Sequence, residues 1–166
     1  MSPQDHSFDI VCKVDYQEVR NAVQMALKEA GQRYDFRGSV VEILFDEKAG
    51  TIALRASDDL KLKSLLDMLF QKFVKRGLSL KAFVPGVVEP RTGDTLSQVL
   101  TIQQGIPQDK GKEVVKSIKE LRLKVQAGIH DDKVKVTAPK IDDLQAIIAA
   151  LRGQEFGIAF QVENYR

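Results

Sequence analysis

The two halves of the sequence repeat one order of predicted secondary structure elements, and this repeat constrains the fold more than any other feature. Alternating apolar residues in the first half predict strands at 8–14, 40–45, 51–56 and 80–84, with helical periodicity over 19–30 and 62–73. The second half shows the same patterns, with strands at 99–103, 124–129, 133–137 and 160–165 and helices over 114–121 and 144–151. Each half therefore has the order strand, helix, strand, strand, helix, strand.

Short motifs recur at matching places in the two halves. An Asp-Asp-Leu string follows each predicted hairpin, at 58–60 and 142–144, and an Arg-Gly pair follows each second helix, at 76–77 and 152–153. These matches indicate an internal duplication. The element order is that of ferredoxin-like (βαββαβ) domains, so we expect an α+β protein with two such domains, residues 1–90 and 91–166. Pro85, Gly86, Pro90 and Gly93 predict a linker between them.

Composition limits the class of protein. The 166 residues are 43% hydrophobic, which is enough for a packed core, and the net charge of +2 means that any nucleic-acid contact must be local. The single cysteine, Cys12, cannot form an intrachain disulfide and is expected to be a small buried residue. No apolar run is long enough to span a membrane, and the leader is polar, so we expect a cytoplasmic protein.

The sequence carries no strong catalytic signature. The two histidines, His6 and His130, lack metal-ligand spacing, and the segment 105–112 departs from a phosphate-binding loop in its glycine spacing. The acidic pairs 58–59 and 142–143 are explained by capping of helices. Aromatic residues of the kind that RNA-recognition motifs stack on bases are missing from 51–55 and 133–137. We therefore expect no enzyme activity, no cofactor and no metal site.

Lysines are the first candidates for ligand binding. Lys112, Lys116 and Lys119 share one side of their predicted helix, opposite its apolar stripe, and the alternative is an ordinary solvated face. Lys133 and Lys135 would share one face of the second hairpin with Thr137, and that face is expected to be open.

Two further segments could hold a nucleotide. Residues 33–38, with the sequence RYDFRG, interleave cations with aromatic rings, which suits base stacking; the alternative is an aromatic anchor with Asp35 paired to an arginine. Residues 103–105, with the sequence QQG, offer amides for base edges or phosphate, or form an ordinary turn.

Taken together, several strings resemble the bacterial YajQ family of nucleotide-binding proteins, and the likeness covers nearly the whole chain. The strings lie at 7–11, 18–22, 33–38, 75–77, 104–106, 123–127, 142–145 and 164–166. The resemblance implies two ferredoxin-like domains whose first strands, 8–14 and 99–105, are exchanged between them. It also implies nucleotide or nucleic-acid binding without a defined catalytic activity, and members of the family are associated with RNA and with cyclic di-GMP.

The chain departs from the family pattern near the second hairpin. His130 and Asp131 stand where the family often has glutamine and glycine, and Pro139 and Ile141 stand where basic residues are common. Lys140 lies between those two and is kept as a partial replacement for the lost positive charge.

The leading hypothesis is a non-catalytic binding module for a nucleotide, with cyclic di-GMP or RNA as the partner. The residues expected to neutralise phosphates are Arg20, Arg37, Lys116, Lys119, Lys124 and Lys140. Phe36 or Tyr165 would stack on a base, and Gln104 or Gln126 would read its edge; Lys124 and Gln126 match the family directly. The alternatives are a protein-interaction module or transcription co-regulator that uses its exposed sheet face, and an unrecognised enzyme acting on nucleotides.

Overall fold

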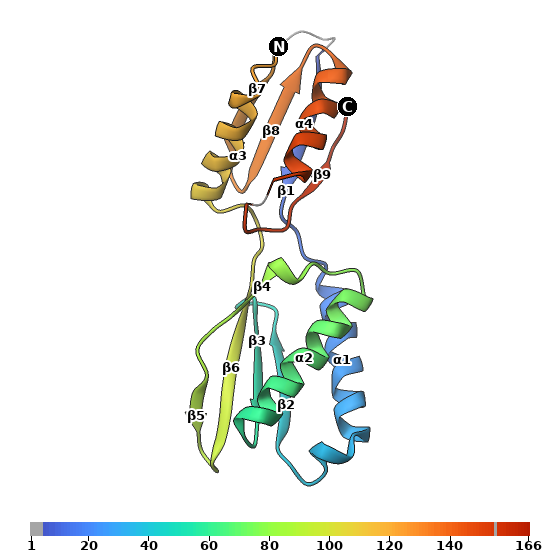
Figure 1. The fold of residues 1–166 in the computed structure, drawn as a ribbon, viewed down its shortest axis with the longest axis vertical. Coiled ribbons are helices and arrows are strands. Elements are labelled where there is room, and N and C mark those ends of the chain that lie inside the picture. The colour runs from blue at the N-terminus through green and yellow to red at the C-terminus, as the bar shows by residue number, and fades with distance from the viewer. Residues whose placement is uncertain (1–4, 155) are drawn as a thin grey trace. The chain divides into compact units, whose positions relative to one another are not determined.

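A computed structural model of the chain describes residues 5–154 and 156–166, which form two compact units (Figure 1). Unit 1 consists of Met1–Lys13 and Gln104–Arg166, and unit 2 consists of Val14–Gln103. The chain therefore passes from one unit to the other after residues 13 and 103. The sequence-based boundary at residue 90 falls inside unit 2.

Unit 2 is an antiparallel sheet with two helices on one side (Figure 1). Its elements are α1 (Tyr16–Gln32), β2 (Val41–Asp46), β3 (Thr51–Ala56), α2 (Asp59–Lys75), β4 (Phe83–Pro85), β5 (Glu89–Arg91) and β6 (Thr95–Ile102). Short 3-10 turns lie at Tyr34–Phe36 and Leu80–Ala82. The strand order is β2-β3-β6-β4, and β5 also pairs with β6.

The helices of unit 2 begin where the sequence predicts. The Asp15 side chain accepts a hydrogen bond from the Gln17 amide at 2.9 Å, and Asp58 accepts one from the Lys61 amide at 2.8 Å. α1 runs two residues beyond the predicted periodicity of 19–30, to Gln32, and the Arg33 amide donates to the Ala30 and Glu29 carbonyls of the last turn. The predicted strand at 80–84 is shorter, since a 3-10 turn takes up its first residues.

The core of unit 2 lies between the helices and one face of the sheet. Ile52 and Leu54 on β3 are fully buried there, as are Leu65 and Leu69 on α2. Phe73 closes the core and stacks on Phe83 with ring centroids 3.9 Å apart. Alternate residues of the same strands, including Leu44 on β2, point to the other face, which no helix of this unit covers.

The predicted linker at 85–93 is instead part of unit 2. Gly86 donates its amide hydrogen to the Val99 carbonyl at 2.8 Å, and Arg91 on β5 pairs with Thr95 on β6. Gly93 and Asp94 both have a positive φ, which makes a tight turn that folds β5 onto β6. Glycine and proline here mark a hairpin within a domain.

Unit 1 is a second antiparallel sheet covered by two helices (Figure 1). Its elements are β1 (His6–Val11), α3 (Gln108–Glu120), β7 (Gln126–His130), β8 (Lys133–Ala138), α4 (Ile141–Arg152) and β9 (Gln161–Glu163). The strand order is β7-β8-β1-β9. β9 is shorter than predicted, although Arg166 continues the pairing through two backbone hydrogen bonds with Ser7.

The core of unit 1 forms around β1. Ile10 on β1 pairs with Val134 on β8 and with Val162 on β9, and its side chain is fully buried. Ile118 from α3 and Ile147 from α4 complete the same apolar cluster. A strand from the N-terminus thus lies at the centre of a sheet whose other strands follow residue 104.

The fold as a whole is α+β, with two antiparallel sheets and four helices, and it is compatible with two ferredoxin-like units. Among the described helices, none is both long and apolar enough to cross a bilayer.

Candidate functional site

Three lysines of α3 border a hollow between this helix and the edge strand β7. Lys112, Lys116 and Lys119 are exposed, and their spacing of four and then three residues places them on one side of the helix. Val115, Gly128 and Ile129 form the rest of the lining. The hollow, here called the α3–β7 groove, has a volume of about 380 Å³.

Local packing explains the shape of the α3–β7 groove. Val114 and Ile118 are buried against the sheet, which turns the lysines outward. Gly111 lets the helix lie close to β7, since a Cβ at this position would be 3.2 Å from Cδ1 of Ile129. The groove therefore has an apolar floor and a cationic rim.

A second hollow of about 340 Å³ lies at the start of β7. Lys124 and Gln126 line it, together with Thr137 from the neighbouring strand and Pro139. Gln126 is two residues before Gly128 on the same strand, so the two hollows lie beside neighbouring positions of β7. Lys140 is exposed directly after Pro139, where α4 begins.

The lysines of unit 1 differ in whether they form ion pairs. Within residues 5–154 and 156–166, no carboxylate forms an ion pair with Lys116, Lys119, Lys124 or Lys140, whereas Lys110 pairs with the nearby Glu113 at 3.6 Å. The α3–β7 groove is therefore bordered by ammonium groups, whereas the second hollow has both the Lys124 ammonium and the Asp5 carboxyl in its lining.

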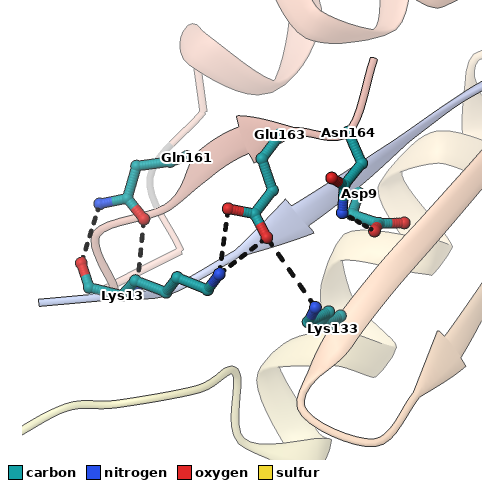
Figure 2. A network of polar contacts seen from close by, with 6 residues as sticks. All are labelled: Asp9, Lys13, Lys133, Gln161, Glu163 and Asn164. Atoms are coloured by element: carbon teal, nitrogen blue, oxygen red, sulfur yellow. Dashed lines mark hydrogen bonds and ion pairs between the residues drawn. The ribbon is translucent and has the colours of Figure 1, made fainter. Parts of the chain in front are cut away.

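The open sheet face of unit 1 is not the positive surface that the sequence predicted. Figure 2 shows that Glu163 on β9 accepts hydrogen bonds from Lys13, at 2.9 and 3.1 Å, and lies 3.8 Å from Lys133. Asp9 on β1 stands opposite Lys135 and accepts a hydrogen bond from Asn164 at 2.8 Å. Acidic residues from β1 and β9 thus balance the lysines of β8.

Two predicted residues of unit 1 lie away from the hollows. Tyr165 is 44% exposed, and one side of its ring stacks on Phe8 with centroids 6.2 Å apart. Gln104 is exposed and precedes Gly105, whose amide donates to the Cys12 carbonyl at 2.7 Å. Neither residue lines the α3–β7 groove or the hollow at Gln126.

The remaining predicted residues belong to unit 2. Arg20 is engaged by Glu47 and by Gln17, so its guanidinium already has polar partners. Phe36 is only 4% exposed and packs in the core, which corrects its expected role, because a buried ring cannot stack on a ligand. Arg37 is exposed and lies over the ring of Tyr34.

The structural alternative for residues 33–38 is thus confirmed for three of them. Phe36 is the anchor, and Arg33 donates two hydrogen bonds to Asp35, at 3.0 and 2.8 Å. These bonds hold the pKa of the Asp35 carboxyl below its ordinary range.

The floor of the α3–β7 groove was missed by sequence reasoning, and Tyr34 lies in the segment proposed for stacking but was not chosen as its stacking residue. In the sequence, Val115 belongs to the apolar stripe of α3. It lines the groove only because α3 packs beside β7. Gly128, a glycine inside a strand, was the one available signal, because such glycines often mark a close approach.

The described residues include neither a metal-binding cluster nor an exposed cysteine thiol. In the described ranges, no cluster of three or more His, Cys, Asp and Glu residues could hold a metal ion. Cys12 is buried, and this burial, followed by the charge of Asp132, raises the pKa of its thiol, which disfavours the reactive thiolate.

Comparison with known proteins gives one consistent result. The family model described as "Nucleotide-binding protein YajQ-like" matches residues 6–166. A protein of Carboxydothermus hydrogenoformans named "Nucleotide-binding protein" is 49% identical over 98% of both chains. A protein of the same name from Trichlorobacter lovleyi is 50% identical over 96% of this chain and 98% of its own. The chain therefore belongs to the YajQ-like family.

Proposed function

We propose that this chain is a non-catalytic nucleotide-binding protein whose phosphate-binding surface is the α3–β7 groove with the adjoining hollow at Gln126. The observation that carries the proposal is a set of unpaired lysines around an apolar floor. Ammonium groups bind phosphate oxygens, and the apolar floor formed by Val115, Gly128 and Ile129 can receive a base or ribose. The relatives are named nucleotide-binding proteins, which supports the same class of ligand.

Single-stranded RNA is the ligand that this surface suits best. The groove volume lies at the lower end of the roughly 300–1,000 Å³ typical of small-ligand sites, which suits one nucleotide. Lys124 and Lys140 lie beyond the groove, where they can reach further phosphates of an extended chain. Cyclic di-GMP is the second candidate, because one of its nucleotides could occupy the groove.

Calorimetric titration with a short single-stranded RNA, cyclic di-GMP, GTP and ATP at two salt concentrations tests the proposal. The double substitution Lys116→Gln and Lys119→Gln should weaken RNA binding roughly tenfold or more, because charge-assisted contacts contribute about 1.5–3 kcal/mol each. It should also reduce the dependence of log affinity on log salt by roughly 0.7 for each lysine removed.

The matched control is Lys28→Gln with Lys75→Gln. These two exposed lysines lie on the helices of unit 2, and their loss changes the net charge by the same amount. Equal weakening by both pairs would show that total charge, and not the groove, determines binding. Absence of saturable binding to all four ligands would reject the proposed function.

We also propose that the two units arose by duplication, with exchange of their first strands. The support is the pairing of β1 with β8 and β9, and of β6 with β3 and β4. In each sheet the central strand is the one that precedes the first helix of the other unit.

A protein-interaction role is the second candidate, and the open sheet face of unit 2 favours it. This face has a hollow of about 220 Å³ lined by Arg55, Arg91 and Val99, beside Leu44, which is 65% exposed. Partner capture that survives substitution of Lys116 and Lys119 but fails in Leu44→Asp would support this role.

A further inference from the structure

Residues 33–38 present an exposed aromatic ring on a turn that the core holds in place. The side chain of Tyr34 is 84% exposed, whereas Phe36, two residues later in the same 3-10 turn, is buried in the core of unit 2. The ion pair of Arg33 with Asp35 and the hydrogen bond from the Arg37 amide to the Tyr34 carbonyl at 3.1 Å fix the turn further. The exposure of Tyr34 is therefore set by the fold.

Arg37 places a cation against this ring. Its guanidinium carbon is 5.9 Å from the centroid of the Tyr34 ring. No carboxylate of the described chain forms an ion pair with Arg37, and the nearby Asp35 is already engaged by Arg33. The turn thus presents one uncompensated positive charge beside an exposed aromatic face.

A hollow lies beside Arg37, and Tyr34 is not among its lining residues. Its volume is about 330 Å³, and Arg37 and Gly38 line it together with Leu27 and Gly31 from the end of α1. A base can stack on Tyr34 while its phosphate meets Arg37 and its ribose enters the hollow, which is how aromatic and cationic side chains share one nucleotide in proteins that bind single strands.

We propose that Tyr34 and Arg37 form a base-stacking site for one nucleotide of a single-stranded RNA, distinct from the α3–β7 groove in unit 1. The inference rests on the proposed function, since it assumes that RNA is a ligand. It assigns the stacking role to Tyr34, whose ring is accessible, and not to Phe36. The uncompensated charge of Arg37 favours a phosphate-bearing partner over an apolar peptide.

Tyrosine-selective NMR tests the site directly. The chain has only three tyrosines, so ring-labelled protein gives three sets of signals, and Tyr34→Phe identifies one set by removing it. Titration with a short single-stranded oligoadenylate should move the Tyr34 ring signals upfield, because a stacked purine shields the ring. The Tyr16 signals should stay in place, since that ring packs edge-on against Phe45.

Affinities measured on variants provide the second readout. Tyr34→Ala should weaken oligoadenylate binding by about 5- to 100-fold, the range for loss of one aromatic–base stack, and Tyr34→Phe should preserve it. Arg37→Gln should weaken binding and reduce its salt dependence. Val87→Ala, at a side chain that is 82% exposed in the same unit, should change nothing.

Three results would overturn the inference. Tyr34 signals that do not move at saturation, while Lys116→Gln with Lys119→Gln still weakens binding, would reject this site and leave the proposed function standing. An equal loss of oligoadenylate affinity in Tyr34→Phe and Tyr34→Ala would reject stacking, because phenylalanine retains the ring. Absence of any oligoadenylate binding by the unmodified protein would reject both the site and RNA as the ligand.

Discussion

The surface cations of this protein differ in whether they form an ion pair with a carboxylate. Arg20, Arg33 and Lys133 have acidic partners, whereas Lys116, Lys119 and Arg37 have none in the described part of the chain. A cation that is already paired must give up its partner before it can bind phosphate, so the unpaired group is the better candidate. Sequence alone could not distinguish paired from unpaired cations where the acidic partner is far away along the chain, as Glu47 is from Arg20.

At the residue scale, Gly105→Ala should destabilise the protein. Gly105 has a φ of +80°, and a Cβ there would lie 2.7 Å from the Cβ of Asp132. The left-handed backbone alone costs an alanine about 1–2 kcal/mol, and the steric contact adds to this. Chemical denaturation measures the change in the free energy of unfolding.

Gly31→Ala is the matched control for that substitution. Gly31 lies within α1, and a Cβ there would meet nothing within 4 Å. Alanine in a helix is favoured over glycine by about 0.5–1 kcal/mol, so this variant should be at least as stable as the unmodified protein. Loss of stability in Gly31→Ala, or none in Gly105→Ala, would contradict the backbone argument.

At the scale of elements, β1 is the strand on which unit 1 depends. It lies between β8 and β9, and Phe8 and Ile10 contribute fully buried side chains to the core. Local patterns in the sequence predicted β1 itself, because alternation is visible within a few residues. They could not show from the residues alone which strands it pairs with, because that choice depends on contacts across the whole chain.

Ile10→Ala should destabilise unit 1 selectively. Truncation of a buried isoleucine costs about 2–5 kcal/mol, and hydrogen exchange should quicken in β8 and β9. Ile52→Ala on β3 is the control, and it should quicken exchange in β2 and β6 instead. Faster exchange of β2, β3 and β6 in Ile10→Ala would contradict the observed pairing.

Helices and hairpins were predicted well because their signals are local. Asp58 caps α2 as expected, and both long hairpins form near their predicted positions. The segment 85–93 was misjudged, because glycine and proline mark a tight hairpin and a linker alike. The α3–β7 groove could be predicted only in part, since the lysines follow from helical spacing but the apolar floor comes from packing between elements.

At the scale of the whole molecule, a net charge of +2 conceals an uneven distribution. On the open face of unit 1 and on the helices of unit 2, several cations form ion pairs with carboxylates. Lys116, Lys119, Lys124 and Arg37 form no ion pair within the described residues, and the same holds for Lys28, Lys75 and Lys135. A nearly neutral protein can therefore carry a local surface suited to phosphate. This agrees with the inference from composition that any nucleic-acid contact must be local.

The most direct test of the central claim is an NMR titration of the backbone amides with a short single-stranded RNA. Within unit 1, the largest shifts should fall on α3 and β7, including Val115, Gly128 and Ile129, and they should disappear in the variant with Lys116→Gln and Lys119→Gln. Shifts confined to the open sheet face, or unchanged in that variant, would contradict the assignment of the phosphate-binding surface to the α3–β7 groove.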